Sequence, residues 1–350
     1  MTAILDPLIA LGTFADDGRA PFAGLVVDGR VWPIGEVAGL ETLAGAPMVE
    51  LFERWDSAWP MLARQVDALR SQSPAGLDLA SLTPLLPVVP RQIVCAGANY
   101  RRHVIEMMTE HGVGSEPGLA PAERRVQAER LMDHRAAAGQ PFAFVKPVST
   151  LLAPGESLVV PCDSSQTDWE LELAVVIGRP CYRVGRDQAL DHVAGYAIAN
   201  DVSARDRLTR ADFPTLGLDW IAGKGAPGFL PLGPFIVPAA FVADPQDLML
   251  TLRLNGETMQ HESTADMIFP IARLIEFIST HMRLLPGDIV CTGSPSGNGT
   301  HYGRYLRDGD MLEGQIDGLG VQCVTCVGEQ VEPGAPTHQP FEPLAELAVP

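Results

Sequence analysis

The segment Asp168-Trp-Glu-Leu-Glu-Leu-Ala-Val-Val176 alternates acidic with apolar residues and then continues as a wholly apolar run. Alternation with a period of two predicts a β-strand that carries Glu170 and Glu172 on one face. Two carboxylates about 4 Å apart repel each other by about 4 kcal/mol at an effective dielectric constant of about 20. A fold retains such a pair when water screens it, when one carboxyl is protonated, or when a cation lies between the two. Taken alone, the pattern favours an exposed acidic strand face.

A second strand-like run adds a third carboxylate. Residues Val193–Ala199 are apolar, and Asp201 stands at the end of this run. An aspartate at a strand end beside two strand-borne glutamates would complete a site made of oxygen ligands. Three carboxylates and water suit Mg²⁺, Mn²⁺ or Ca²⁺ far better than zinc. Nearby Arg205 and Lys224 would add positive charge toward an anionic substrate.

The residues around His103 form another candidate for chemistry. Residues 100–108 predict a short helix on which His103 and Glu106, three positions apart, share a face. A carboxylate beside an imidazole fixes its tautomer and raises its basicity, which would make the pair a general base. Without other support, such a pair is more often a surface salt bridge. After a flexible run at 112–118, residues 121–138 predict a charged helix, whose charges are more simply explained as a solvated face.

Short apolar runs punctuated by Gly and Pro continue along most of the chain after Ile93. Irregularly spaced strands of this kind predict a sandwich or roll that is rich in β-structure and carries helical insertions. Apolar residues at helical spacing over 266–284 predict one longer helix. The expected fold class is therefore α+β. The predicted strands are Leu158–Val160, Leu171–Ile177, Val193–Ala199, Phe235–Val237, Met249–Leu254, Asp288–Cys291 and Val321–Val327.

The first part of the chain has a different pattern of residues and contains no motif that suggests chemistry. An Asp28-Gly29 pair between two apolar runs predicts a hairpin over Phe22–Pro33, and residues 49–69 have helical spacing. A stretch rich in Pro, Ser and Leu over 73–90 indicates a linker. We therefore expect an N-terminal domain with its linker at 1–88, a catalytic domain at 89–330, and a loosely ordered tail at 331–350.

Composition limits the classes of function. The chain has 350 residues, 46% of them hydrophobic and 19% charged, which fits a folded globular protein of about two domains. The formal net charge is −18, so a nucleic-acid surface is not expected. No apolar run approaches the ~20 residues of a membrane helix, and no basic segment precedes the first apolar stretch, so we expect a soluble, cytoplasmic protein without membrane contact.

The basic residues are divided unevenly between two types. Of the 25 lysines and arginines, only Lys146 and Lys224 are lysine. A chain that otherwise uses arginine would keep lysine where a compact ammonium cannot be exchanged for a planar guanidinium. We therefore expect both lysines to be functional, the alternative being that they persist by chance.

Six motifs follow one another between about Ile93 and Val327. They are Gly97-Ala-Asn-Tyr-Arg-Arg-His103 with Glu106, Phe144-Val-Lys-Pro147, Asp168 to Gly178, Gly195-Tyr-Ala-Ile-Ala-Asn-Asp-Val-Ser-Ala-Arg-Asp206, Gly223-Lys224 with Pro231-Leu-Gly-Pro234, and Thr292-Gly-Ser-Pro-Ser-Gly297. In this order they resemble the fumarylacetoacetate hydrolase family. Each motif alone is weakly specific, but a chance match of all six in order is improbable.

The resemblance implies that family's mixed β-sandwich roll with a small N-terminal α/β domain, usually assembled as a homodimer. It implies a divalent cation, normally Mg²⁺ and sometimes Mn²⁺ or Ca²⁺, and a lid segment at about 100–140 that orders over substrate. The matching metal ligands are Glu170, Glu172 and Asp201. The matching catalytic residues are His103 and Glu106, which activate water, and Lys224, which stabilises negative charge. Positions near the substrate are matched by Arg205, Lys146 and Ser294.

Three departures from the family pattern bear on the identity of the substrate. Leu208 stands where many members carry a glutamine that contacts substrate. Pro227 stands where an aspartate is frequent, and the segment before Phe144 is much longer than in short members. These changes leave the matched metal ligands and the His103–Glu106 pair intact.

The leading hypothesis is a divalent-metal-dependent hydrolase that cleaves a C–C bond in a β-diketo acid of the acylpyruvate type. Water activated by His103 and Glu106 would attack a carbonyl, while the cation and Lys224 would stabilise the departing enolate. The alternative is a 2-oxo acid decarboxylase, hydratase or isomerase that works through the same enolate. A second alternative is a catalytically silent keto-acid-binding protein. The expected partner in each case is a small 2-oxo or β-diketo acid.

Overall fold

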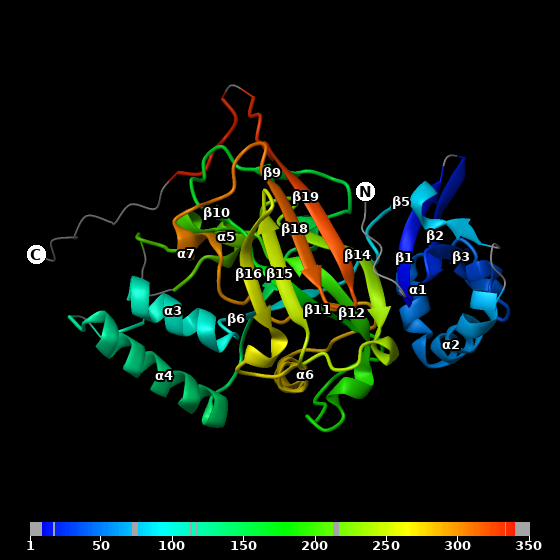
Figure 1. Cartoon of the computed structure of the whole chain (residues 1–350), viewed down its shortest axis with the longest axis horizontal. Coiled ribbons are helices and arrows are strands. Elements are labelled where there is room, and N and C mark those ends of the chain that lie inside the picture. The colour runs from blue at the N-terminus through cyan, green and yellow to red at the C-terminus, as the bar shows by residue number, and fades with distance from the viewer. Residues whose placement is uncertain are drawn as a thin grey trace, which may run out of the picture.

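The computed structural model describes residues 9–16, 18–71, 76–112, 114–116, 118–212, 217–332 and 334–339. Helices and strands are mixed along these ranges, so the α+β, β-rich class expected from the sequence is confirmed (Figure 1). Residues 333 and 340–350 of the predicted tail lie outside the described ranges, as do residues 113 and 117 of the predicted flexible run. Within these ranges, no helix is both long enough and apolar enough to span a membrane.

One large sheet crosses the molecule and joins its N-terminal strands to the rest. Its strands lie in the order β4 (Leu77–Asp78), β3 (Arg30–Pro33), β2 (Arg19–Val27), β1 (Ile9–Asp16), β14 (Leu230–Pro238), β12 (Val193–Asn200), β11 (Leu171–Ile177), β17 (Ile289–Cys291), β6 (Ile93–Gly97) and β7 (Phe142–Lys146). Two short strands are added at β1 and β14, namely β5 (Thr83–Pro84) and β8 (Leu151–Leu152). The predicted hairpin is confirmed as β2 and β3, with Asp28 and Gly29 at positive φ in the turn. The division of the chain into domains stays a prediction.

A smaller sheet packs against the large one. Its strands lie in the order β16 (Glu257–Ser263), β15 (Met249–Leu254), β18 (Met311–Ile316), β19 (Gly320–Gly328) and β9 (Leu158–Val160). A separate two-stranded ladder pairs β10 (Thr167–Asp168) with β13 (Ser203–Ala204). This ladder lies next to the carboxylate-bearing strands, and it becomes important for the site.

Strand β11 is buried on both faces and separates two layers of the core. Leu173 and Val175 pack with Leu252 of β15 between the two sheets. Ala174 and Val176 belong to a second cluster on the opposite face, which includes buried residues of α1 and α2. Because side chains alternate between the two faces of a strand, Glu172 lies on the same face of β11 as Ala174 and Val176.

The helices are α1 (Met48–Glu53), α2 (Trp55–Ser71), α3 (Arg101–His111), α4 (Pro121–Ala138), α5 (Trp220–Lys224), α6 (Ile271–His281) and α7 (Gly299–Tyr302). The bounds predicted for α4 are confirmed, because Pro121 suits a first helical turn. The helix predicted over 266–284 is shorter, since Pro270 precedes its first turn and cannot lie in a helix interior. The helical pattern at 49–69 is divided between α1 and α2 at Arg54.

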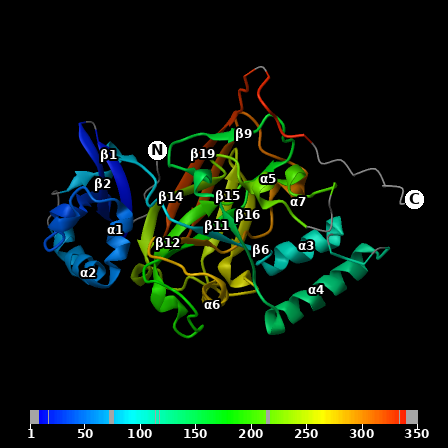
Figure 2. The same cartoon turned by 180° about the vertical axis from the view of Figure 1, so that it is seen from behind.

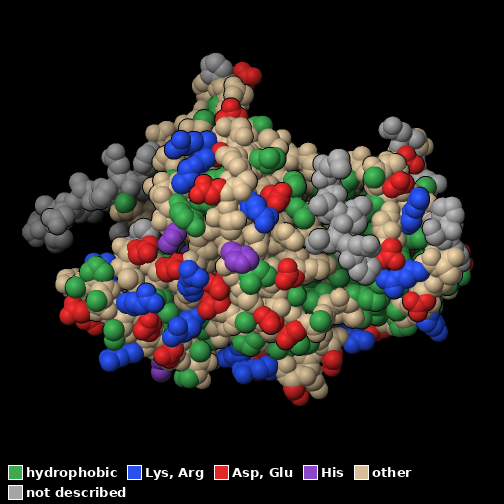
Figure 3. Space-filling model, viewed as in Figure 1, with side chains coloured by type: hydrophobic (Ala, Val, Ile, Leu, Met, Phe, Trp, Pro, Cys, Tyr) green, Lys and Arg blue, Asp and Glu red, His purple; other side chains and the backbone are tan. Residues whose placement is uncertain are grey.

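Helices α3 and α4 pack together at the end of the molecule opposite α1 and α2 (Figures 1 and 2). An ion pair between Arg101 and Asp133 at 2.7 Å joins the two helices. The backbone N–H of Arg102 donates to Asp266 over 2.8 Å and fastens α3 to the body of the protein. In Figure 3, acidic and basic side chains are interspersed over the end of the molecule that α3 and α4 form.

Candidate active site

Glu170, Glu172 and Asp201 come together where β11 begins and β12 ends. The two strands are antiparallel with Leu171 opposite Asn200, so the residue before β11 lies beside the residue after β12. The backbone N–H of Asp201 donates to the carbonyl oxygen of Glu170 over 2.8 Å. All three acidic side chains are buried, and each offers an oxygen within 4.8 Å of the others. The structure therefore brings the three predicted carboxylates into one cluster.

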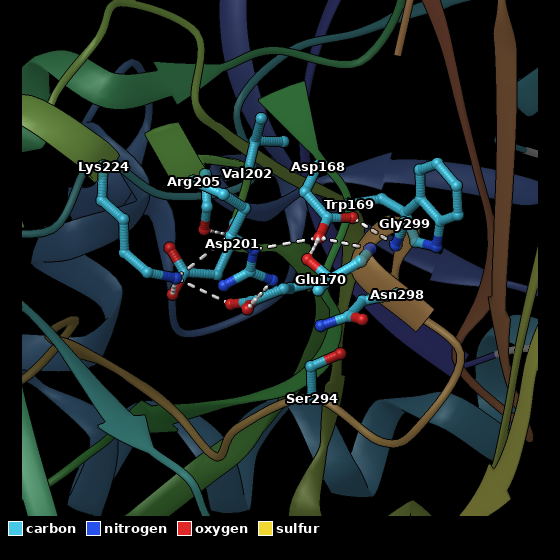
Figure 4. Close-up of polar contacts among 12 residues, drawn as sticks. Asp168, Trp169, Glu170, Asp201, Val202, Arg205, Lys224, Ser294, Asn298 and Gly299 are labelled. Atoms are coloured by element: carbon cyan, nitrogen blue, oxygen red, sulfur yellow. Dashed lines mark hydrogen bonds and ion pairs between the residues drawn. The ribbon is translucent and has the colours of Figure 1, made fainter. Parts of the chain in front are cut away.

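Three basic side chains are paired with this cluster. Lys224 donates from Nζ to Oε2 of Glu170 over 2.7 Å and to Oδ2 of Asp201 over 2.6 Å (Figure 4). Arg205 donates to Oε1 of Glu170 over 2.5 Å. Lys146 donates to Oδ1 of Asp201 over 2.5 Å, and both lysines are buried. Both lysines of the chain thus bind the same carboxylate.

Asp168 holds Arg205 in place and also fixes the start of α7 (Figure 4). Arg205 donates from Nε to Oδ2 of Asp168 over 2.9 Å. The backbone N–H of Gly299 donates to Oδ1 of Asp168 over 2.5 Å, and the Thr300 hydroxyl donates to Oδ2 over 3.1 Å. The β10–β13 ladder sets the distance between Asp168 and Arg205. Asp168 has no role predicted from the sequence, although it begins the acidic stretch that reveals the site.

The pKa values of Glu170 and Glu172 are shifted in opposite directions. Burial acts to raise the pKa of Glu170, but the positive charges of Arg205 and Lys224 outweigh it and hold that pKa below its ordinary value. Burial, followed by the negative charge of Asp201, raises the pKa of Glu172 well above its ordinary value. Among the described residues, no ammonium or guanidinium forms an ion pair with Glu172. Additional positive charge would therefore stabilise the ionised form of Glu172.

The donor set fits a hard divalent cation. Carboxylate oxygens are the ligands that Mg²⁺ and Mn²⁺ prefer, and Glu170, Glu172 and Asp201 supply them from one buried cluster. A carboxylate oxygen has two lone pairs, so an oxygen that accepts from Lys224 can also bind a cation. A dication would also offset the repulsion among the three carboxylates. These three residues are the ones that would hold the metal.

The carboxylates line a cavity of about 400 Å³, a size that suits a small organic ligand. Seven residues predicted for the site line it: His103, Glu170, Glu172, Asp201, Arg205, Lys224 and Ser294. Lys146 and Glu106 are not among the described residues that line it. Much of the remaining wall is apolar, formed by Val104, Met107, Met108, Leu131, Met132, Phe144, Leu208, Leu218 and Trp220.

His103 reaches the cavity from α3, whereas Glu106 has partners elsewhere. Among the described residues, no hydrogen bond joins His103 to Glu106. Glu106 accepts from Nε of Arg102 over 3.0 Å and from the hydroxyl of Ser296, and Nδ1 of His301 lies 3.7 Å from its Oε2. Burial lowers the pKa of His103 to about 4, so its imidazole is neutral at pH 7. The predicted pair shares a helix without being hydrogen-bonded.

Two amides with no role predicted from the sequence hold the loops around the cavity. Asn99 donates from Nδ2 to the carbonyl oxygens of Thr292 at 2.9 Å and Phe269 at 3.0 Å. Gln260 of β16 donates to the hydroxyl of Ser294 over 2.9 Å. Asn99 is one of only four asparagines in the chain, a scarcity that signals a constrained position. Gln260 carries no comparable signal, because glutamine is not scarce in this chain.

The chain matches known proteins along most of its length. The family model of the fumarylacetoacetate (FAA) hydrolase C-terminal region matches residues 92–327. The 2,4-didehydro-3-deoxy-L-rhamnonate hydrolase of Sphingomonas sp. (strain SKA58) is 38% identical over 71% of this chain and 80% of its own. The human mitochondrial oxaloacetate tautomerase FAHD2B is 34% identical over 82% of this chain and 86% of its own.

Solved structures extend the similarity to the fold. The maleylpyruvate hydrolase of Sphingobium sp. SYK-6, solved with manganese(II) and pyruvate, has a TM-score of 0.65 and 26% identity. The match covers 92% of this chain and 100% of that one. These relatives are hydrolases and tautomerases of keto acids, and one of them binds a divalent metal. With the family model matched from β6 to β19 and the motifs gathered at one site, the chain belongs to the fumarylacetoacetate hydrolase family.

Proposed function

We propose that this protein is a divalent-metal-dependent hydrolase that cleaves a C–C bond in a β-diketo acid of the acylpyruvate type. One observation carries the proposal: the neutral imidazole of His103 lines the same cavity as the buried carboxylate cluster and Lys224. A base for water, oxygen ligands for a cation and a fixed positive charge are the groups that such a cleavage needs.

The reaction can be written with the residues of the cavity. When bound, a divalent cation would hold the 2-oxo-carboxylate end of the substrate and withdraw charge from it. His103 removes a proton from a water molecule whose oxygen adds to the distal carbonyl carbon. The bond between that carbon and the pyruvate methylene breaks, and its electron pair remains on the pyruvate part. The proton held by His103 then passes to that methylene, so a carboxylic acid and pyruvate are released.

Lys224 supplies a positive charge that is present throughout the reaction. Burial acts to lower the pKa of Lys224, but the charges of Asp201 and Glu170 outweigh this effect and hold it above its ordinary value. The ammonium therefore stays protonated and can stabilise the negative charge that develops on the pyruvate part. We further propose Mg²⁺ as the native cation, with Mn²⁺ or Ca²⁺ as substitutes, and a homodimer as the assembly.

Keto–enol tautomerisation of a 2-oxo acid is the second candidate. This reaction is favoured by the 34% sequence identity with the human oxaloacetate tautomerase FAHD2B. It is also favoured by the contacts of Glu106, which accepts hydrogen bonds from Arg102 and Ser296. A lone base such as His103 is sufficient to move a proton between carbon and oxygen, whereas activation of water gains more from an orienting carboxylate.

Cation-supplemented assays separate these candidates. Chelator-treated protein is reconstituted with Mg²⁺ or Mn²⁺ and given acetylpyruvate, butanoylpyruvate or oxaloacetate, and the products are identified by NMR. We expect cation-dependent release of pyruvate and a carboxylic acid from the acylpyruvates. Interconversion of oxaloacetate enol and ketone without any acylpyruvate cleavage would favour the tautomerase. Cation-dependent binding with no turnover of any compound would favour a silent binding protein.

A further inference from the structure

The cavity contains a guanidinium for which the described part of the protein supplies no counter-charge. Arg135, in the last turn of α4, lines the cavity and is only partly exposed. It donates from one terminal nitrogen to the carbonyl oxygen of Ala98 over 3.0 Å, and its guanidinium carbon lies 5.5 Å from the ring centroid of Phe269. Within the described ranges, no aspartate or glutamate forms an ion pair with Arg135. Burial lowers its pKa, although an arginine remains charged near neutrality.

The other basic side chains of the cavity are in a different situation. Arg205 pairs with Asp168 and Glu170, and Lys224 pairs with Glu170 and Asp201. Neighbouring arginines on α3 and α4 also form ion pairs. These pairs are Arg101 with Asp133, Arg102 with Glu106, and Arg125 with Glu129. Arg135 therefore combines partial burial, a place in the cavity wall and no carboxylate partner among the described residues.

The position of Arg135 separates it from the carboxylate cluster. Glu170, Glu172 and Asp201 belong to the ends of β11 and β12, whereas Arg135 belongs to the wall that α4 contributes. Leu131, one helical turn earlier on α4, lines the same cavity, and so does Met132. The same terminal nitrogen of Arg135 donates to the carbonyl oxygen of Ala98 and lies 3.8 Å from Sδ of Met132, so these two contacts orient the guanidinium. No described residue accepts a hydrogen bond from its other two nitrogens, which leaves their N–H donors for a ligand. This wall of the cavity thus combines apolar side chains with the guanidinium of Arg135.

We propose that Arg135 binds a second carboxylate, carried at the acyl end of the substrate, and thereby selects dicarboxylic substrates with a short apolar spacer. This inference rests on the proposed function, because it takes the 2-oxo-carboxylate end to lie at the acidic cluster. The planar fork of a guanidinium matches a carboxylate with two parallel hydrogen bonds. The spacer would lie against apolar side chains such as Leu208 and Leu131, which explains why a polar contact is absent at Leu208. Arg135 is then a specificity-determining residue.

A matched pair of substrates tests this proposal. Succinylpyruvate carries a terminal carboxylate, and 4-methylpentanoylpyruvate carries an isopropyl group of similar shape at the same place. With Mg²⁺ present, we expect wild-type kcat/KM to favour succinylpyruvate. Arg135→Met should lower kcat/KM for succinylpyruvate by about 10- to 100-fold and leave the neutral substrate nearly unchanged. The control is Arg130→Met on the same helix, because Arg130 is exposed and is not among the described lining residues.

Binding measured without turnover separates this inference from the proposed reaction. Calorimetry in Mg²⁺ compares 2-oxoheptanedioate with 7-methyl-2-oxooctanoate, which differ in the same carboxylate-for-isopropyl exchange. Tighter binding of the diacid by wild-type protein, abolished in Arg135→Met, supports the carboxylate site even if no acylpyruvate is cleaved. Equal binding of the two by wild-type protein, or an equal loss for both in Arg135→Met, overturns it even if acylpyruvates are hydrolysed. The wild-type comparison remains decisive if the variant fails to fold.

Discussion

Lys224 donates from Nζ to Oδ2 of Asp201 over 2.6 Å, and both side chains are buried. The other oxygen of Asp201 accepts from Lys146 over 2.5 Å, so the two lysines of the chain flank one carboxylate. Ammonium groups are compact, and two of them fit around a carboxylate that must also approach Glu170 and Glu172. The bias toward arginine elsewhere in the chain is consistent with a steric requirement at these two positions.

Lys224→Arg should reduce kcat by about 100-fold or more while the protein remains folded. A guanidinium is larger than an ammonium and cannot donate to Glu170 and Asp201 from the same point without displacing them. Steady-state rates on an acylpyruvate, together with circular dichroism, check this outcome. Arg253→Lys, at the partly exposed ion pair with Glu313, serves as the control and should be neutral. Near-normal turnover in Lys224→Arg would show that lysine is not required.

Glu172→Gln should weaken Mn²⁺ binding by about 10-fold or more and abolish turnover at limiting cation. The substitution removes a charged oxygen from the proposed ligand set. It keeps a side-chain oxygen that can accept from the backbone N–H of Gly293, whose nitrogen lies 2.7 Å from Oε2 of Glu172. Titration with Mn²⁺ followed by electron paramagnetic resonance measures the affinity, and thermal unfolding checks the fold. Glu313→Gln provides the control for loss of a surface carboxylate. Unchanged Mn²⁺ affinity would remove Glu172 from the ligand set.

His103→Ala should lower the rate of hydrolysis by about 10²- to 10⁴-fold, and Mn²⁺ affinity should be retained both in this variant and in Glu106→Ala. Neither residue belongs to the three carboxylates that are proposed to hold the cation. Comparison of the two variants also shows whether Glu106 assists His103 in the activation of water or only fastens α3. If Glu106 only fastens α3 through Ser296, its loss should raise KM more than it lowers kcat, unlike the loss of His103. A fully active His103→Ala enzyme would contradict activation of water by this residue.

The acid limb of the pH profile should lie well below the ordinary value for histidine. Burial disfavours the imidazolium form of His103 and lowers its pKa to about 4. The base form is therefore present at neutral pH and is lost only as the pH falls through about 4. With saturating Mg²⁺, kcat/KM should stay nearly constant from pH 7 to about 5. An apparent pKa near 6.5, at pH values where circular dichroism shows a folded protein, would contradict the lowered pKa of His103.

Binding of oxalate with Mg²⁺ should slow amide hydrogen exchange in α3 and α4. Both helices contribute to the cavity wall, and polar contacts such as those of Arg102 with Asp266 and Glu262 fasten α3 to the body of the protein. A ligand in the cavity would add contacts to both helices and lower the population of locally opened states. Exchange followed by mass spectrometry, with α6 as an internal reference, measures the effect. Equal protection with and without ligand would argue against a lid.

Local patterns were sufficient to predict several elements of the fold. The run Leu171–Ile177, apolar except for Glu172, predicted β11 with its observed bounds, and both faces of this strand are buried. The charged stretch at 121–138 predicted α4 with its observed bounds. The helix at 266–284 was predicted too long, because apolar spacing outweighed Pro270 in the interpretation. Strand β18 was not predicted, since its sequence mixes polar residues and glycine with few apolar ones.

The candidate site could be predicted where its residues follow strand periodicity or family motifs. Glu170, Glu172 and Asp201 are of this kind, and they lie together. The pairing of Lys146 with Asp201 and the anchoring of Arg205 by Asp168 depend on tertiary packing over long sequence separations. No local pattern contains that information. Arg135 likewise has the sequence context of a solvated helix face, and only the fold places it in the cavity wall.

Product analysis in ¹⁸O-enriched water tests the proposed hydrolysis most directly. The protein, loaded with Mg²⁺, is incubated with an acylpyruvate, and the released acid and the remaining substrate are analysed by mass spectrometry. The remaining substrate corrects for spontaneous exchange of its ketone oxygens. If His103 activates water for attack on the distal carbonyl, the released carboxylic acid should carry one ¹⁸O beyond that correction. Formation of CO₂, or of an isomer without added label, would contradict C–C hydrolysis.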